Sequence, residues 1–453
     1  MKKIISFISE EWQSYWVKSG FFSLIGRSSN LIFGFATFLV LVRYLGPEDF
    51  GTWTLFVSVC TFLDLWKSGF IANPLIRYLS AESGQKYSDI VNASFFLNIL
   101  ISLFQILLII IFSDFLSSIW NSPELKSMFL IYIGSIIFQV PISHFNYIQQ
   151  ANLNFRGTFL TNLSRNSLFF TLILVTLLLK FDFNLIDLTL FQLFSIICGA
   201  SVAFLTGKKY GSGHFRIKKK WVIELLNYGK YTFGTNVSST ILRNVDSWML
   251  GYLISPVAVG IYNPAMRMSN LFELPTASLT SIVFPELIKR IKKEGISAAK
   301  YLYEKSIGLI LAVLLPLVFF VILFAKPIIL LIAGSEYMES VPILRITMLY
   351  GLIIPLNRQV GITLDALGKA KLTFLFVLRN AIINIVLNYV LISKIGLIGA
   401  ALATLLTYLL VLIYNQYYIH KTLNIKIHRM IYFIGFFYKQ GFIKIKYLLF
   451  DTQ

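Results

Sequence analysis

The amino-acid sequence predicts an all-α polytopic membrane protein, with about 12 transmembrane helices in two six-helix bundles related by an internal repeat. Three observations predict this fold class: the composition, the placement of the basic residues and a self-similarity at a fixed offset. Of the 453 residues, 57% are hydrophobic and 13% are charged, whereas about 25% of a soluble chain is charged. A soluble enzyme and a disordered chain are therefore both excluded.

Uninterrupted apolar stretches give the expected spans in chain order. They are 22–43, 50–71, 92–113, 127–149, 158–179, 185–206, 231–252, 262–284, 306–325, 341–361, 372–392 and 396–418. Each is close to the length of about 20 residues that crosses the hydrocarbon core of a bilayer. Proline removes a helix hydrogen bond, so we expect kinks at the prolines inside these spans, which are Pro264, Pro275, Pro316 and Pro355.

The basic residues divide by side when they are placed on these spans. The chain has a net charge of +19, with 40 Lys and Arg residues. Of these, 29 fall on the side of the N-terminus, counting Lys67 and Arg358 at the ends of their spans, 5 on the opposite side, counting Arg43, and 6 deeper inside spans. The positive-inside rule then predicts a multi-pass protein of the plasma membrane with both termini in the cytoplasm. Because the basic residues are scattered over many loops, we expect no nucleic-acid partner; the runs at 216–220 and 289–293 set orientation or contact anionic lipid headgroups.

No cofactor is expected from the sequence. Cys60 and Cys198 both lie in apolar runs, and the four histidines are scattered, so neither a disulfide nor a zinc site is indicated. The phosphate-binding pattern G-x-x-x-x-G-K-[ST] of nucleotide-driven pumps does not occur.

A weak self-similarity recurs at an offset of 209 residues. Pro47 and Gly51 align with Pro256 and Gly260, and each pair falls in the outer turn after the first span of a half. Pro and Gly at such points suit a tight reversal of the chain. The repeat predicts four segments. They are an N-terminal six-helix bundle (1–206), a basic cytoplasmic linker loop (207–228), a C-terminal six-helix bundle (229–420) and a basic amphipathic cytoplasmic tail (421–453). The apolar stretches of the tail are too short to cross a membrane, so it is either an interfacial segment or disordered.

The first helix of each half carries a polar stripe at helical spacing. The stripes are Ser23, Arg27, Asn30, Gly34 and Thr37, and at the same offset Thr232, Asn236, Ser239, Arg243 and Asp246. Polar side chains at membrane depth face protein or a water-filled cavity rather than acyl chains. Duplicated halves of this kind are typical of transporters, whose substrate site lies at the interface of the repeats.

Four motifs resemble a known family. They are Arg43-Tyr44-Leu45-Gly46-Pro47-Glu48-Asp49-Phe50-Gly51; Asp246-Ser247-Trp248-Met249-Leu250-Gly251 with Val259-Gly260-Ile261-Tyr262-Asn263-Pro264-Ala265 downstream; Glu273-Leu274-Pro275 with Phe284-Pro285 downstream; and Gly396-Leu397-Ile398-Gly399-Ala400-Ala401-Leu402-Ala403. In order and spacing they resemble the polysaccharide flippases of the MOP exporter superfamily, the O-antigen or Wzx type.

This resemblance implies a V-shaped, two-lobed fold like that of MATE transporters, with alternating access. It implies a flippase rather than an enzyme, which moves an undecaprenyl-pyrophosphate-linked oligosaccharide from the cytoplasmic to the outer leaflet of the bacterial inner membrane. The cargo would be an O-antigen, capsule or other surface-polysaccharide repeat unit, as in lipopolysaccharide biosynthesis. The implied partners are this lipid-linked substrate, membrane lipids and polysaccharide polymerase with chain-length machinery, and the protein would act as a monomer.

Arginines inside spans are the candidates for binding the anionic head of such a lipid. A charge at mid-span costs about 2.5–3.5 kcal/mol even on the most lenient scale, and guanidinium matches phosphate oxygens in a two-pronged geometry. We expect Arg27, Arg243 and Arg267 to bind the pyrophosphate, with Asn30 and Asn236 of the polar stripes as further substrate ligands. The other span arginines, Arg165, Arg345 and Arg379, lie closer to span ends. Alternatively, Arg243 and Asp246 neutralise each other on one helix face.

Acidic residues within spans are candidates for coupling transport to protons, sodium or the membrane potential. They are Asp64 and Glu273, which align in the repeat, and Asp246. The alternative role for each is a salt bridge with a nearby arginine. Asn380, Asn384 and Asn388 form another stripe, which either binds sugars or joins helices.

Two other functions fit the sequence less well. A MATE-like drug or cation antiporter would have a cavity dominated by acids, whereas six span arginines against three acids favour an anionic substrate. A membrane-embedded polysaccharide-assembly enzyme needs a sizeable outer loop with paired carboxylates, and the longest expected outer loops (114–126, 180–184 and 326–340) are short and contain no such pair.

Overall fold

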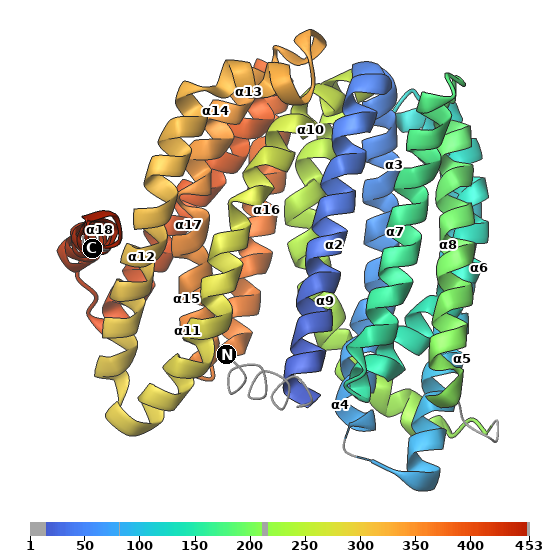
Figure 1. Ribbon diagram of the computed structural model, residues 1–453, viewed down its shortest axis with the longest axis horizontal. Helices are drawn as coiled ribbons and strands as arrows, with labels where there is room; N and C mark the ends of the chain where they lie inside the picture. Colours follow the sequence, from blue (N-terminus) through green and yellow to red (C-terminus); the bar gives the residue numbers. More distant parts are fainter. Residues whose placement is uncertain (1–14, 81, 211–215, 451–453) are drawn as a thin grey trace. The chain divides into compact units, whose positions relative to one another are not determined.

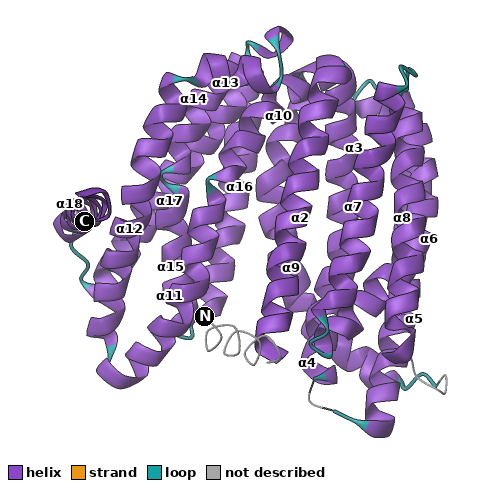
Figure 2. Cartoon of the chain, in the orientation of Figure 1, coloured by secondary structure: helices purple, strands orange, loops and turns teal. Residues whose placement is uncertain are grey.

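A computed structural model describes residues 15–80, 82–210 and 216–450. Every regular element in these residues is a helix (Figures 1 and 2). Nine helices in the described part are long and apolar enough to cross a membrane, and Ser28–Tyr44 is a shorter apolar helix. All the expected spans fall on helices, so the predicted all-α membrane fold is confirmed.

The chain divides into two compact units, each formed by two separate segments of the sequence. Unit 1 comprises Met1–Leu45 and Thr52–Val237, and unit 2 comprises Gly46–Gly51 and Ser238–Gln453. Two helices are shared, because the first residues of α3 (Gly46–Lys67) belong to unit 2 and the first residues of α9 (Lys219–Leu253) belong to unit 1. Two of the boundaries therefore fall inside helices α3 and α9, and the third falls at the bend before α3.

Unit 1 is built from long helices that pack on their neighbours in sequence and beyond. Besides α3 and the start of α9, its elements are α2 (Tyr15–Tyr44), the π-helical η1 (Ser68–Ala72), α4 (Asn73–Leu79), α5 (Gly84–Ile119), α6 (Glu124–Ala151), α7 (Phe155–Leu178), α8 (Leu185–Gly207) and η2 (Lys208–Tyr210). Helix α8 packs against α6 and α7, α5 against α6, and α2 against α7. A capping box begins α8, in which Asn184 and Asp187 each accept a backbone N–H of the other.

Unit 2 contains more and shorter helices. They are the rest of α9, α10 (Pro256–Leu271), α11 (Glu273–Glu294), α12 (Ile296–Leu323), α13 (Ala325–Ile332), η3 (Ser335–Tyr337), α14 (Ser340–Gly351), α15 (Ile354–Ala366), α16 (Ala370–Ile395), α17 (Leu397–Leu423) and α18 (Ile427–Phe450). Helix α16 packs against α17, α10 against α14, and α11 against α12 and α15. The expected spans 262–284 and 341–361 are each two helices, with breaks just before Pro275 and Pro355, whereas the helix continues through Pro264 and Pro316.

The two repeated Pro-x-x-x-Gly segments contact each other within unit 2. A Cβ atom built on Gly51 would collide with the carbonyl oxygen of Pro256, and one built on Gly260 would collide with that of Pro47. The contact is thus reciprocal, with each glycine lying against the first turn of the other helix. Small residues permit backbones to approach this closely in membrane helices, which explains why glycine occupies both positions of the repeat.

Helix α18 docks on α12 through a buried carboxylate. Glu304 is fully buried; its Oε1 accepts the backbone N–H of Lys426 at 2.8 Å, and its Oε2 lies 3.8 Å from Nη1 of Arg429. Phe433 lies against Gly308, where any Cβ would collide with it. Most of the residues of the expected tail are helical, because α18 spans Ile427–Phe450. These contacts attach α18 to α12 of unit 2.

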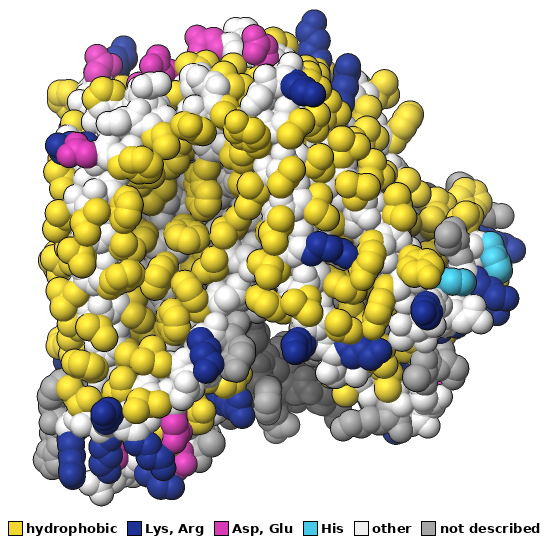
Figure 3. Space-filling model, turned by 180° about the vertical axis from the view of Figure 1, so that it is seen from behind, with side chains coloured by type: hydrophobic (Ala, Val, Ile, Leu, Met, Phe, Trp, Pro, Cys, Tyr) yellow, Lys and Arg dark blue, Asp and Glu magenta, His cyan; other side chains and the backbone are white. Residues whose placement is uncertain are grey.

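The described surface is apolar over much of the length of the helices. Large side chains such as Leu103, Leu107 and Ile110 of α5 are more than half exposed, while Asn98 and Gln105 of the same helix are fully buried. Figure 3 shows hydrophobic side chains spread over the helices, with basic and acidic side chains gathered mainly near their ends. Apolar residues outside and polar residues inside are the pattern expected of helices that face lipid.

Candidate functional site

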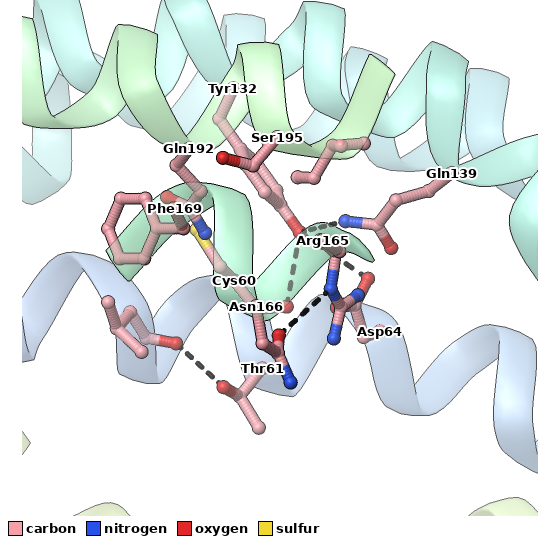
Figure 4. Close-up of a pocket in the computed structure, with 12 residues that line it drawn as sticks. Cys60, Thr61, Asp64, Tyr132, Gln139, Arg165, Asn166, Phe169, Gln192 and Ser195 are labelled. Atoms are coloured by element: carbon pink, nitrogen blue, oxygen red, sulfur yellow. Dashed lines mark hydrogen bonds between the residues drawn. The ribbon is translucent and has the colours of Figure 1, made fainter. Parts of the chain in front are cut away.

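Unit 1 encloses a polar cavity of about 220 Å³ between α3, α6, α7 and α8 (Figure 4). Two of its lining residues are charged, Asp64 from α3 and Arg165 from α7. The other lining residues are Val57, Cys60, Thr61, Tyr132, Gln139, Asn166, Phe169, Gln192, Ser195 and Ile196. The charges of the lining residues therefore balance.

Two short chains of hydrogen bonds hold the polar groups of this cavity, one ending at Asp64 and the other beginning at Arg165. Gln139 Nε2 donates to Tyr132 Oη at 3.3 Å, and Tyr132 Oη donates to Asp64 Oδ1 at 3.4 Å. On α7, Arg165 Nε donates to Asn166 Oδ1 at 3.4 Å. Asn166 Nδ2 in turn donates to Asn30 Oδ1 on α2 at 2.7 Å. Three amides and a phenol thus position the one carboxylate and the one guanidinium that face the cavity.

Unit 2 encloses a second cavity of about 210 Å³ between α9, α15, α16 and α17. Its charged lining residues are Arg243 from α9 and Arg358 from α15, and the lining residues that the structure describes include no acid. The other lining residues are Ser239, Leu242, Ile354, Asn357, Val360, Gly361, Thr373, Phe376, Val377, Asn380, Tyr408 and Asn415. This cavity combines two permanent positive charges with neutral amides and hydroxyls, a donor set suited to an anion.

Asp246 lies away from the unit 2 cavity, although it is one helical turn from Arg243. Its side chain is buried and accepts three hydrogen bonds of 2.7 Å, from Tyr262 Oη, Thr404 Oγ1 and Asn388 Nδ2. The described residues contain no ion pair between Arg243 and Asp246. The carboxylate is therefore held by neutral donors, and Arg243 keeps its charge for the cavity.

The remaining residues singled out in the sequence have varied environments. Asn30 lies beside the unit 1 cavity through its bond to Asn166, and it also lines a neighbouring cavity of about 170 Å³. Asn236 is half-buried on α9, and Arg267 is exposed on α10. Neither of these two residues lines a cavity described above. The side chains of Arg27 and Glu273 lie outside the described part of the structure.

Three arginines contribute more than their sequence positions indicated. Arg358, which the sequence places at the N-terminal-side end of its span, lines the unit 2 cavity, and Arg165 lines the unit 1 cavity. Arg379 bonds to Asn380 at 3.1 Å and Asn415 at 3.4 Å and lies 4.0 Å from the centre of the Tyr414 ring. The sequence does contain a signal for Arg165 and Arg379, because each is followed directly by an asparagine, Asn166 on α7 and Asn380 on α16. These two Arg-Asn pairs are not 209 residues apart, so the repeat does not align them.

The asparagine stripe on α16 divides between two roles. Asn384 donates to Thr404 and Thr407 on α17, and Asn388 donates to Asp246 on α9, so these two join helices. Asn380, one turn earlier, lines the unit 2 cavity. The described residues include no group of three or more His, Cys, Asp or Glu side chains placed to hold a metal ion.

Comparisons with known proteins agree on the class of protein. A family model described as polysaccharide biosynthesis protein matches residues 40–342, more than half of the chain. A 400-residue stretch is 21% identical to a putative O-antigen transporter of Shigella flexneri, covering 85% of this chain and 93% of that protein. Another of 235 residues is 23% identical to a probable low-salt glycan biosynthesis flippase of Haloferax volcanii, covering 52% of this chain and only 50% of that protein.

The fold has a close counterpart among solved structures. The lipid II flippase MurJ in an inward closed conformation superposes with a TM-score of 0.76 at 17% sequence identity. The superposition covers 96% of this chain and 94% of that protein. At this identity the likeness concerns the fold alone.

Proposed function

The chain belongs to the family of polysaccharide biosynthesis proteins, and on this premise we propose that it is a flippase for an undecaprenyl-pyrophosphate-linked oligosaccharide. It moves the lipid from the cytoplasmic to the outer leaflet by alternating access. The resemblance read from the four motifs is confirmed by the family match, and the relatives compared above are named for transport or flipping rather than for catalysis. The lipid-linked substrate and the direction of transport are our inference.

The unit 2 cavity is the observation that carries this proposal. Two arginines face it, and a charge at membrane depth is costly enough to mark a functional site by default. Guanidinium binds two phosphate oxygens at once, so we assign the pyrophosphate to Arg243 and Arg358. Arg27 and Arg267 are proposed to contact the same group at other stages of the cycle, and Asn30 and Asn236 to contact the substrate beside them.

Asp246 is the best-supported candidate for ion coupling. Its bonded partners are uncharged, so the buried carboxylate either binds a proton or attracts a cation. Two further oxygens nearby, Oδ1 of Asn384 and Oδ1 of Asn388, are buried and accept no hydrogen bond. We propose that Asp246 takes up a proton or sodium ion during the cycle, with Asp64 and Glu273 as secondary candidates. Transport by the Asp246→Asn variant that still responds to both gradients would contradict this role.

The orientation and assembly follow the same proposal. Both termini lie in the cytoplasm of a bacterium, the protein spans the inner membrane as a monomer, and polymerase and chain-length machinery act on its product outside. A reporter fused after residue 453 tests the orientation, because an enzyme that folds only outside the cytoplasm would stay inactive there.

Reconstituted vesicles provide the test of the flippase function. The wild type should flip a fluorescent undecaprenyl-pyrophosphate-linked oligosaccharide, and Arg243→Ala and Arg358→Ala should each reduce the rate by about tenfold or more, equivalent to about 1.4 kcal/mol. Arg345→Ala, another exposed arginine of a unit 2 helix, is the matched control and should keep its rate. Full activity of both cavity variants at equal expression would overturn the proposal. So would a wild type that transports a cationic drug but not the lipid, as an antiporter does.

A further inference from the structure

We propose that the unit 1 cavity is a subsite for a single uncharged sugar ring of the transported saccharide. The inference rests on the proposed flippase function and adds to it a place where one pyranose is recognised. The sugar subsite lies in unit 1, whereas the pyrophosphate is assigned to unit 2. Its ligand chemistry is that of a ring with hydroxyl or acetamido substituents.

The size of the cavity limits what it can hold. At about 30 Å³ for each water molecule, a volume of about 220 Å³ corresponds to a handful of waters. Pockets for drug-sized ligands begin at about 300 Å³. One monosaccharide therefore fits within this volume, and the rest of a longer saccharide would extend beyond it.

The lining has polar groups that the protein itself leaves unsatisfied. Gln192 Oε1 is buried and accepts no hydrogen bond. In the described residues Arg165 bonds only through its Nε, which leaves its terminal nitrogens available as donors. Sugar hydroxyls both donate and accept, so a single ring can satisfy the amide oxygen and the guanidinium together.

Charge and shape favour an uncharged sugar over an anion. Asp64 and Arg165 are the charged lining residues, and their charges are opposite, in contrast to the two arginines of unit 2. In Figure 4, Phe169 lies on the side of the cavity opposite Asp64 and Gln139. Its ring stacks on Trp53, with ring centroids 6.2 Å apart and an interplanar angle of 21°. An aromatic face gives an apolar surface against which the C–H groups of a pyranose can lie.

Binding to the full-length protein in nanodiscs tests this subsite. The probes are methyl glycosides of glucose, galactose, N-acetylglucosamine and glucuronic acid, with undecaprenyl pyrophosphate as a separate probe of the carrier site. At least one uncharged glycoside should bind about fivefold or more tightly than the glycoside of glucuronic acid. Asn166→Ala and Gln192→Leu should each remove most of that difference without changing the affinity for undecaprenyl pyrophosphate.

Ser167→Ala is the matched control, because Ser167 is the next residue on α7, does not line the cavity and bonds to a backbone oxygen of its own helix. It should preserve both affinities. The proposal is overturned if no uncharged glycoside binds, if the glycoside of glucuronic acid binds best, or if the two cavity variants weaken binding of undecaprenyl pyrophosphate equally. The two kinds of probe also separate this proposal from the flippase function. A protein that does not bind undecaprenyl pyrophosphate but binds a methyl glycoside, and no longer binds it in Asn166→Ala, has the subsite without the flippase function.

Discussion

Unit 1 and unit 2 place their intramembrane charges differently. In unit 1 the acid and the arginine line one cavity, where Asp64 and Arg165 carry opposite charges. In unit 2 the acid is separated from the arginines, because Asp246 is buried among neutral donors while Arg243 and Arg358 face the cavity. One unit therefore presents a neutral polar cavity and the other a positive one.

The difference teaches that a repeat can preserve packing without preserving chemistry. The Pro-x-x-x-Gly segments recur in register because a close helix crossing requires glycine in both copies. The acids Asp64 and Glu273 recur in the same register, but two other intramembrane charges do not: the position 209 residues before Asp246 is Thr37, and the one 209 after Arg165 is Phe374. The residues that differ between copies are thus where the two units divide their functions.

The largest expected effect is on the buried acid of unit 2. Asp246→Ala leaves three donors without their acceptor, each worth about 1–3 kcal/mol when buried, so the free energy of unfolding should fall by about 3 kcal/mol or more. Asp64→Ala removes one 3.4 Å bond from a half-buried group and should cost about 1 kcal/mol. Melting temperatures in detergent measure both. Equal losses would contradict the contrast between Asp246, which is buried among neutral donors, and Asp64, which faces a cavity. Asp246→Asn should retain part of the stability.

A smaller loss is expected at the shared helix crossing. Gly51→Ala and Gly260→Ala each place a methyl group against a backbone carbonyl, and overpacking of this kind costs about 1–3 kcal/mol. Because one separation of the helices relieves both collisions, the double variant should lose less than the sum of the two. Gly34→Ala is the control, since nothing lies within 4 Å of its Cβ position. Additive losses in a thermal melt would show that the two glycines do not act on one contact.

Affinity for inorganic pyrophosphate sharpens the contrast between the cavities. Calorimetry on the purified protein should show that the double variant Arg243→Ala/Arg358→Ala binds pyrophosphate about tenfold or more weakly than the wild type, equivalent to about 1.4 kcal/mol. Arg165→Ala should change it less than about twofold, because the acid Asp64 lines the same cavity and disfavours an anion there. If Arg165→Ala has the larger effect, the anion site belongs to unit 1 and the assignment is wrong.

The smallest effect is expected where α18 attaches to unit 2. Glu304→Gln keeps an oxygen for the N–H of Lys426 but loses the attraction to Arg429, which is about half exposed. Such a pair is worth about 1 kcal/mol or less, so α18 should exchange its amide hydrogens faster while the melting temperature hardly changes. Glu304→Leu removes both contacts and should have the greater effect on exchange. Unchanged exchange in Glu304→Leu would show that the apolar contacts at Gly308 hold the helix alone.

Much of the fold was accessible from the sequence because its causes are local. Apolar length sets each span, so the expected spans all fall on helices. The recurring Pro and Gly were expected in turns, but both pairs lie in the first turns of α3 and α10, where proline is tolerated at a helix start. The breaks before Pro275 and Pro355 were anticipated only as kinks, since whether a proline bends or ends a helix depends on what packs beside it.

The candidate sites were less accessible. The sequence positions of Arg165, Arg379 and Arg358 indicate only that they lie toward span ends, because the sequence gives depth along a helix but not the facing helix. The alternative of a salt bridge between Arg243 and Asp246 also rested on one helix alone. The partners that bind Asp246 come from α10, α16 and α17, at separations that no local pattern records.

The sequence by itself determined that this protein is a helical membrane protein with a duplicated frame, because hydrophobic length, turn residues and loop charges each act within a single segment. Only the tertiary structure decided which polar residues share a cavity and which are sealed. A side chain at membrane depth is satisfied by whichever helices pack around it, and those helices are brought together from positions more than a hundred residues apart.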